Sequence, residues 1–144
     1  MIPYLLDINV LIALAWPSHV HHRATQKWFA GKRAAGFRTC PITQTGFVRI
    51  SSNPKLTPDS TSPGEALALL QRVTALPQHQ FWPDHLTLLD AIGNKTLLVG
   101  HQQVTDAYLL ALARFHAGAL ATLDRGVLSL AGANPETVEL IDNI

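Results

Sequence analysis

Three aspartates are the residues of this chain whose type and placement best suit chemistry. Asp7 lies in "YLLDINVLIAL", between two apolar runs, whereas Asp106 and Asp124 occur in "QVTDAYLL" and "ALATLD". An unpaired carboxylate is costly to bury, so Asp7 is either a buried cap or a ligand. Carboxylates that meet at one point repel each other unless one is protonated or a cation neutralises them. Hard oxygen donors of this kind suit Mg²⁺, with Mn²⁺ as the alternative.

Two of these acids also have a purely structural interpretation. Asp106 follows Thr105 at the start of a helical pattern, where a carboxylate simply caps and charges the helix. Asp124 precedes Arg125 and Gly126 and fits a turn. The elements that carry the three acids must decide whether they meet.

The first half of the chain alternates between short apolar strands and helices. Strands are predicted over residues 2–7 and 37–42. The first is followed by a helix that ends at Pro17. A second helix covers residues 18–32 with Ser18 as its N-cap, and a third covers residues 43–52 with Thr43 as its N-cap.

The second half continues the alternation after a loop-rich stretch at residues 53–64. Ser62 and Glu65 form a capping box, with Pro63 at the first helical position, ahead of a helix over residues 65–73. A strand at 79–83 and a short helix at 85–92 follow. The strongest helical pattern covers residues 103–118, from a Thr105 cap to Gly118, and strands are predicted at 119–124 and 137–141. The inward face of the long helix is predicted to comprise Tyr108, Leu109, Leu112 and Phe115.

Strands separated by helices imply parallel pairing with helices on both faces of the sheet. The prediction is one domain over residues 1–144, an α/β/α sandwich of three layers with a small, mainly parallel sheet. Sites in open parallel sheets form outside the carboxyl ends of the strands. Asp7 and Asp124 end strands and Asp106 begins a helix, so all three are expected at the carboxyl edge of the sheet, which we call the rim.

The composition is that of a well-cored globular protein. Of the 144 residues, 47% are hydrophobic and 15% are charged. No apolar run reaches the length of about 18 residues that a membrane span needs. Cys40 is the only cysteine, which excludes an intramolecular disulfide. We therefore expect a cytoplasmic protein without a membrane segment.

The net charge of +1 hides an asymmetry. No acidic residue lies between Ile8 and Pro58. That stretch holds the cations Arg23, Lys27, Lys32, Arg33, Arg38, Arg49 and Lys55. A basic half beside a few acids suits an enzyme that holds a polyanion at a cation site, and the alternative is a basic face for a dimer or partner.

Four segments in register resemble the PIN-domain family, and within it the VapC-type toxin ribonucleases. They are "LLDINVLIAL", "TCPITQTGFVRI", "QVTDAYLLALA" and "LATLDRGV", and the resemblance covers nearly the whole chain. It implies a Mg²⁺-dependent endoribonuclease with a small parallel sheet between helices. It also implies a homodimer and a cognate VapB-type antitoxin whose C-terminal segment occupies a groove lined by the basic helix at residues 19–33.

The resemblance assigns roles to individual residues. The first, third and fourth family acids fall on Asp7, Asp106 and Asp124. Asn9 and Thr105 match the polar residues that accompany the first and third acids. The second family acid, usually Glu, falls on Gln44, or on Thr45 if the register slips by one. Gln44 offers a neutral oxygen in place of a charge, which favours one tightly held ion over two.

Under this hypothesis the aspartates hold Mg²⁺, which activates a water for phosphodiester hydrolysis. Gln44 or Thr43 orients ligands from the second shell of the site. The substrate is single-stranded or looped RNA, with tRNA or another structured RNA as candidates. The candidate RNA contacts are Arg49, Arg125, Arg23 and Lys27. For Arg49, an ion pair on a helix surface is the alternative.

Other interpretations remain open. A phosphatase that uses Asp7 as nucleophile would want a second acid at position 9, where Asn9 stands. A PIN-like binding module that lost activity with its second acid fits Gln44. The His19, His21 and His22 group suggests zinc, but the sequence shows no fourth ligand.

Overall fold

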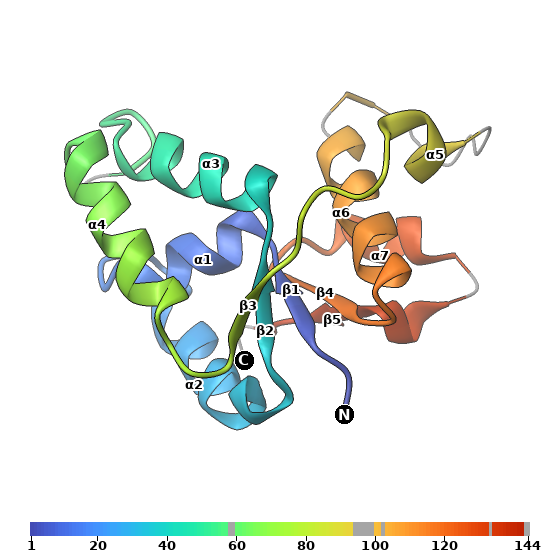
Figure 1. The fold of residues 1–144 in the computed structure, drawn as a ribbon. Helices are drawn as coiled ribbons and strands as arrows, with labels where there is room; N and C mark the ends of the chain where they lie inside the picture. Colours follow the sequence, from blue (N-terminus) through green and yellow to red (C-terminus); the bar gives the residue numbers. More distant parts are fainter. Residues whose placement is uncertain (58–59, 94–99, 102, 133, 143–144) are drawn as a thin grey trace.

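The centre of the molecule is a sheet of five parallel strands. A computed structural model describes residues 1–57, 60–93, 100–101, 103–132 and 134–142. Among these residues the strand order is β3 (His79–Phe81), β2 (Phe37–Thr39), β1 (Tyr4–Leu6), β4 (Ala119–Thr122) and β5 (Val138–Leu140). All four pairings are parallel (Figure 1). The predicted parallel sheet and its predicted strands are therefore confirmed, although each strand is shorter than its sequence pattern.

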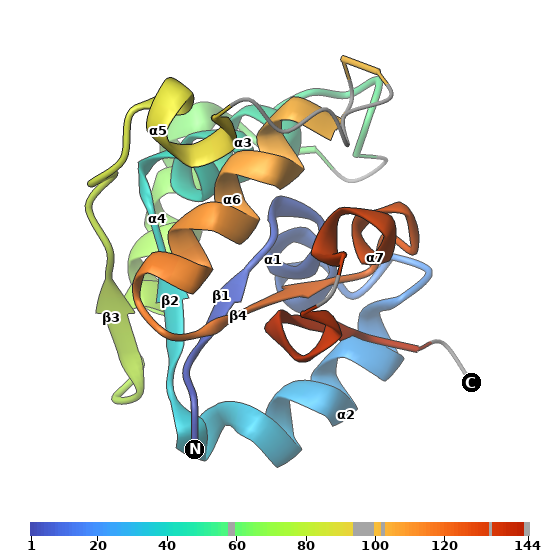
Figure 2. The ribbon, with the colours of Figure 1, turned by 90° about the vertical axis from the view of Figure 1, so that its right-hand side faces the viewer.

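The two faces of the sheet bury different cores because successive strand residues point in opposite directions. Leu5 and Leu120 belong to one cluster, and Leu6 and Ala121 belong to the other. Figures 1 and 2 show helices over both faces, so the three-layer prediction is confirmed. The helices on the Leu6 side are α1 (Ile8–Ala15), α2 (His22–Lys32), α3 (Pro41–Ser51) and α4 (Pro63–Thr74). Those on the other side are α5 (Leu88–Ile92), α6 (Gln103–Phe115) and α7 (Gly126–Ala131).

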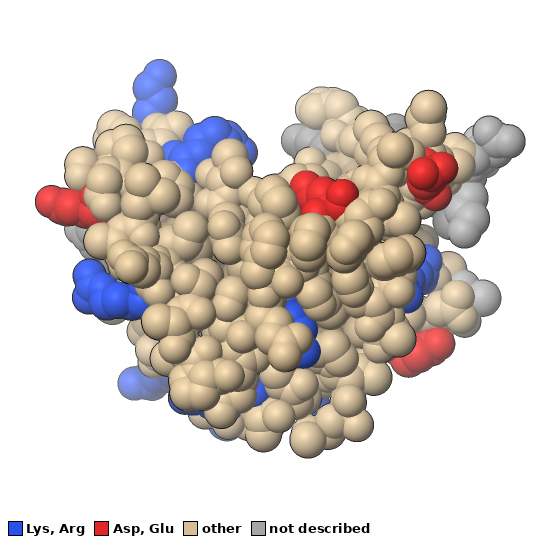
Figure 3. Space-filling view, in the orientation of Figure 1, with Lys and Arg blue, Asp and Glu red and all other residues tan. Residues whose placement is uncertain are grey.

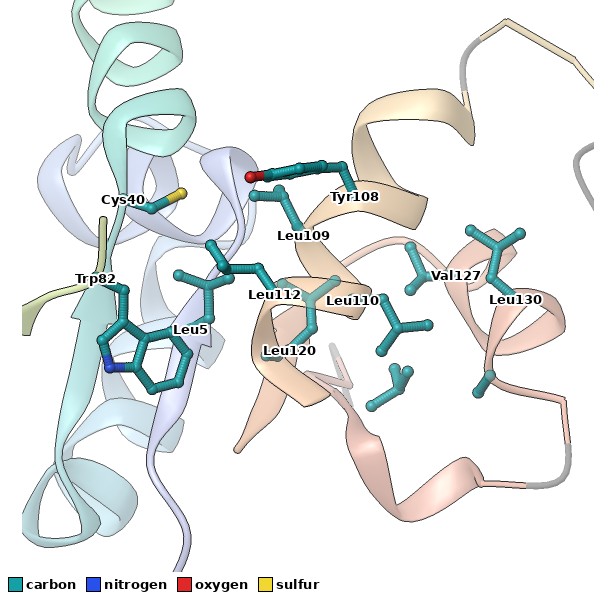
Figure 4. Close-up of a cluster of buried hydrophobic side chains, with 13 residues drawn as sticks. Leu5, Cys40, Trp82, Tyr108, Leu109, Leu110, Leu112, Leu120, Val127 and Leu130 are labelled. Carbon is teal, nitrogen blue, oxygen red and sulfur yellow. The ribbon is translucent and has the colours of Figure 1, made fainter. Parts of the chain in front are cut away.

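Figure 4 shows the Leu5 cluster, in which Leu109 and Leu112 of α6 face the strands.

Two short 3₁₀ turns, η1 (Arg33–Ala35) and η2 (Pro135–Thr137), complete the described elements. No helix among the described residues has the length and apolar character that crossing a membrane requires.

Two predicted helix starts are wrong. Ser18 does not cap α2, which begins at His22, because tight turns occupy the preceding residues: the His19 amide donates to Trp16 and the His22 amide donates to His19. Thr43 does not cap α3 either. The helix begins earlier, with Cys40 as N-cap and Pro41 in the first turn. The predicted capping box at Ser62 is confirmed, since its hydroxyl accepts a hydrogen bond from the Glu65 amide at 3.1 Å.

Helix α6 also corrects the sequence analysis. Thr105 lies inside the first turn and is not the cap, since the helix already includes Gln103. Phe115 is 57% exposed instead of facing inward. At about 100° per residue it lies about 120° around the helix from buried Leu109. The left-handed residue after the helix is Ala117, with φ of 56°, and not Gly118. The helix α7 has no counterpart in the sequence prediction.

Candidate active site

The three aspartates lie at the carboxyl ends of neighbouring strands and at the start of α6. Asp7 directly follows β1, and Asp124 follows β4 after one intervening residue. Asp106 stands in the first turn of α6. β1 pairs directly with β4, so the structure brings the ends of these two strands side by side, as the sequence analysis expected.

Asp7 is buried, with 4% of its surface exposed, and both of its carboxylate oxygens accept hydrogen bonds. Oδ1 accepts from the Ile8 amide at 2.7 Å, which makes Asp7 the N-cap of α1. Oδ2 accepts from the Thr122 hydroxyl at 2.8 Å. The alternatives of cap and ligand are therefore not exclusive, because a carboxylate oxygen keeps lone pairs beyond those used here.

Thr122 connects two of the acids, and the sequence analysis missed it. Its hydroxyl donates to Asp7 and accepts from the backbone amide of Asp124 at 3.1 Å. Asp124 in turn accepts from the Gly126 amide at 2.8 Å through Oδ1, which opens α7. The available signal was a hydroxyl residue two positions before Asp124, closing a strand that is otherwise Ala-Leu-Ala. A fully buried hydroxyl at a strand end needs a partner, and here the partner is an acid.

The three carboxylates interact electrostatically. Burial raises the pKa of Asp7, and the charge of Asp124 raises it further, against the opposing hydrogen bonds from Thr122 and Ile8. The pKa of Asp106 is raised to about 7, first by burial and then by the charges of Asp7 and Asp124. Asp7 and Asp106 are thus harder to ionise, first because they are buried and then because other carboxylates are near. A cation would remove this penalty.

Oxygen donors that repel each other are the chemistry expected of a divalent-cation site. Within the described ranges, however, no three His, Cys, Asp or Glu side chains are grouped as metal ligands. The donor types and their charge therefore fit a divalent ion, but the side chains would have to draw together around it.

A pocket of about 330 Å³ opens beside the aspartates. Ile8 and Thr105, which adjoin Asp7 and Asp106 in the chain, form part of its wall. The remaining wall comes from α3 and consists of Pro41, Ile42, Thr45, Gly46 and Arg49. Gly46 is required here, because a Cβ at this position would collide with the Ile8 side chain. Figure 3 shows the molecule hollowed along its upper edge, with acidic side chains within the hollow and basic ones on the α3 and α4 side.

A sequence model of the PIN domain matches residues 4–133 of this chain. The chain belongs to the PIN-domain family. Ribonuclease VapC38 of Mycobacterium tuberculosis is 45% identical over 95% of this chain and 96% of its own length. Ribonuclease VapC39 of the same species is 46% identical over 90% of this chain and 94% of its own length. Ribonuclease VapC44 is 42% identical over 85% and 87% of the two chains. The resemblance to the VapC branch of PIN domains is therefore confirmed.

In this PIN domain, Gln44 and Thr45 both line a pocket between α3 and α4, but only Thr45 also lines the pocket beside the aspartates. The Gln44 amide donates to the Thr39 hydroxyl at 3.0 Å, and that hydroxyl bonds to His79 at 2.7 Å. Thr45 lines the pocket beside Ile8 and Thr105. Of the two residues at the position of the second family acid, Thr45 is the one that shares a wall with neighbours of the aspartates.

The other predicted site residues of the PIN domain divide into two groups. Arg49 and Thr105 line the pocket, and Asn9 is exposed in the first turn of α1. Thr43 is fully buried, and its hydroxyl accepts a hydrogen bond from the Cys40 amide at 3.0 Å. Thr43 therefore holds the start of α3 and does not face the pocket.

Three predicted RNA contacts lie away from the pocket. Arg125 pairs with Asp142 at 2.7 Å, with both side chains largely exposed. Arg23 and Lys27 are exposed on α2, which Figures 1 and 2 place toward the amino ends of the strands, opposite the aspartates. Neither residue lines the pocket at Thr105.

The histidine group before α2 is engaged locally. His19 Nδ1 accepts from the His21 amide at 3.0 Å, and His22 Nδ1 lies 2.7 Å from the Ala13 carbonyl oxygen. The His19 and His22 rings thus hold the turn that leads into α2. This structural role is the alternative to zinc binding.

Proposed function

We propose that this chain is a divalent-metal-dependent endoribonuclease, the toxin of a toxin–antitoxin pair, with Mg²⁺ as its metal. The observation that carries the proposal is the electrostatic coupling of Asp7, Asp106 and Asp124 on one rim. The relatives named as VapC ribonucleases support the assignment of RNA as substrate. They also support a VapB-type antitoxin as partner. A cytoplasmic homodimer is part of the same proposal.

The chain's own residues divide the work. Asp7, Asp106 and Asp124 would hold the ion, and Thr122 keeps the Asp7 carboxylate in place. When bound, the ion activates a water and stabilises the charge that develops on the scissile phosphate. Arg49, on the pocket wall, supplies a cation to the phosphate backbone. Water and substrate enter through the open pocket beside Thr105.

One observation favours a second candidate function, that of an inactive PIN-like binding module. α3 carries no acid in its first turn, and the Gln44 amide is used by Thr39. A site with one charge fewer holds its metal more weakly. The phosphatase alternative gains no support, because Asn9 is exposed in α1 and provides no second acid.

The deciding experiment measures cleavage of cellular RNA by the purified protein, freed of partners, with Mg²⁺ or with EDTA. Asp7→Asn is the test variant, and Asp90→Asn, at an exposed position of α5, is the matched control. We expect cleavage that requires Mg²⁺ and that Asp7→Asn abolishes while Asp90→Asn retains it. Folded protein that cleaves nothing under any condition would favour the binding module. Equal cleavage by both variants would indicate a contaminating nuclease.

A further inference from the structure

Arg38 of β2 is a cation without a carboxylate partner among the described residues. Its guanidinium donates to the carbonyl oxygens of Phe37 at 3.0 Å and Gln78 at 3.3 Å. It lies 5.7 Å from the ring centre of Trp82. Its Nε is buried and has no hydrogen-bond partner within the part of the chain that the structure describes. A buried donor of a charged group that lacks a partner costs free energy, so the site is incomplete as it stands.

Aromatic and imidazole rings extend from this arginine, beginning with Trp82. His116 stacks on Trp82, with ring centres 4.2 Å apart and planes 15° apart. His85 Nδ1 lies 3.2 Å from His116 Nε2. The His85 ring centre lies 5.5 Å from that of Phe115, which is 57% exposed. We call Arg38, Trp82, His85, Phe115 and His116 the cationic-aromatic cluster.

The charge of Arg38 has no ion-pair partner among the described residues. Burial lowers the pKa of His116, and the charges of His85 and Arg38 lower it further. Arg38 likewise lowers the pKa of His79, after the larger effect of burial. One acid, Asp84, shares a hydrogen bond with Cys40 and interacts electrostatically with His85. An incoming anion would therefore meet the unpaired cation of Arg38 and the imidazole of His116, with Asp84 on the His85 side of the cluster.

The position of the cluster points to a nucleic acid rather than a single anion. His116 follows the end of α6, and Asp106 stands in its first turn. Ten residues at about 1.5 Å each separate the two by about 15 Å. A single strand of RNA that reaches from one to the other spans a few nucleotides. Exposed rings beside a cation suit bases and phosphates together.

We propose that the cationic-aromatic cluster is a second RNA contact, which binds single-stranded RNA several nucleotides away from the scissile bond. The inference rests on the proposed ribonuclease function and assigns to that substrate a further point of attachment. Arg38 contacts a phosphate through its guanidinium group, and Phe115 with the two histidines provides faces on which bases stack. Recognition through stacking and phosphate contacts is tolerant of sequence.

The experiment measures the Kd of a fluorescent single-stranded oligoribonucleotide as a function of salt. All proteins carry Asp7→Asn, so that binding is observed without cleavage. Arg38→Gln is compared with Arg72→Gln, which removes one charge from an exposed position of α4. We expect Arg38→Gln to weaken binding about tenfold and to lower the salt slope by about 0.7, as for one lost phosphate contact on a single strand. Arg72→Gln should change neither.

Arg38 also donates to two carbonyls, so a second pair of variants protects the test against misfolding. Phe115→Ala is compared with Leu89→Ala, since both side chains are exposed. We expect Phe115→Ala to weaken binding at least about fivefold and Leu89→Ala to leave it unchanged.

The outcomes separate the two proposals. Equal Kd values for the parent, Arg38→Gln and Phe115→Ala, with unchanged thermal melts, would overturn the second RNA contact and leave the ribonuclease proposal intact. A poly-glutamate peptide that binds in an Arg38-dependent manner, with RNA binding unaffected, would overturn it in favour of an acidic protein segment. An Asp7→Asn parent that binds no RNA at all would overturn both.

Discussion

Replacing Thr122 with valine removes one hydroxyl and keeps the shape of the side chain. That hydroxyl is fully buried, donates to Asp7 at 2.8 Å and accepts from the Asp124 amide at 3.1 Å. The Thr122→Val variant leaves the buried Asp7 carboxylate with the Ile8 amide as its remaining hydrogen-bond donor among the described residues. The carboxylate is then less well satisfied, so the pKa of Asp7 rises beyond its already raised value.

The size of the effect follows from this geometry. A hydrogen bond to a charged group contributes about 1.5–3 kcal/mol to stability. The added methyl returns about 0.8 kcal/mol through burial of apolar surface. We therefore expect the free energy of unfolding to fall by about 1–2 kcal/mol where Asp7 is ionised. The loss shrinks as the pH falls, because a protonated Asp7 depends less on the donor. Cleavage of RNA should fall about tenfold or more, as for other residues that orient a metal ligand.

Urea unfolding measures the stability, and Thr25→Val provides the matched control. Thr25 is also fully buried, but its hydroxyl has no hydrogen-bond partner in the described ranges. The same exchange there removes an unsatisfied polar atom and should be neutral or stabilising by up to about 1 kcal/mol. Equal losses in both variants would show that burial alone decides the effect. The reasoning that Thr122 supports the Asp7 carboxylate would then be refuted.

Two further variants and one metal experiment test the same rim. Gly46→Ala should lose about 1–3 kcal/mol because its Cβ meets Ile8, whereas Gly31→Ala, where space is open, should gain up to about 1 kcal/mol in urea unfolding. The raised pKa of Asp106 means that the metal-free protein loses stability as the pH rises from 3.8 to about 7. Asp106→Asn should lack that loss and be more stable at pH 8 by about 1–2 kcal/mol after solvent screening, so parallel pH profiles would contradict the assignment. Added Mg²⁺ should raise the melting temperature of the wild type at pH 8 but not at pH 4, and a rise that Asp7→Asn retains would place the ion elsewhere.

The sequence predicted the acids on the rim because each acid is tied to a local pattern. Asp7 and Asp124 follow apolar strands, and Asp106 lies in the first turn of a strongly periodic helix. Because the strands are parallel, their carboxyl ends, and with them the acids, lie at one edge of the sheet. α7 was missed because it has only six residues and Arg125, its N-cap, makes no side-chain hydrogen bond that would mark the start.

The direction of residues on α3 was beyond sequence reasoning. Whether Gln44 or Thr45 faces the pocket depends on how α3 packs against α1, and the contact between Gly46 and Ile8 fixes that packing. This contact joins residues far apart in the chain, so no periodic pattern carries it. The same limit applies to Arg125, whose partner Asp142 lies at the far end of the chain.

The register between β1 and β4 explains why one hydroxyl can connect two acids. Leu6 pairs with Ala121, so the next residues along the two parallel strands are Asp7 and Thr122. A slip by one residue would turn Thr122 to the opposite face of the sheet and leave the Asp7 carboxylate without its hydroxyl donor. The same slip would move Leu120 out of its core cluster, so packing of the core selects the register that assembles the rim. The burial that accompanies this register also raises the pKa of Asp7. The packing of the core therefore holds the Asp7 carboxylate in a place where its ionisation is unfavourable.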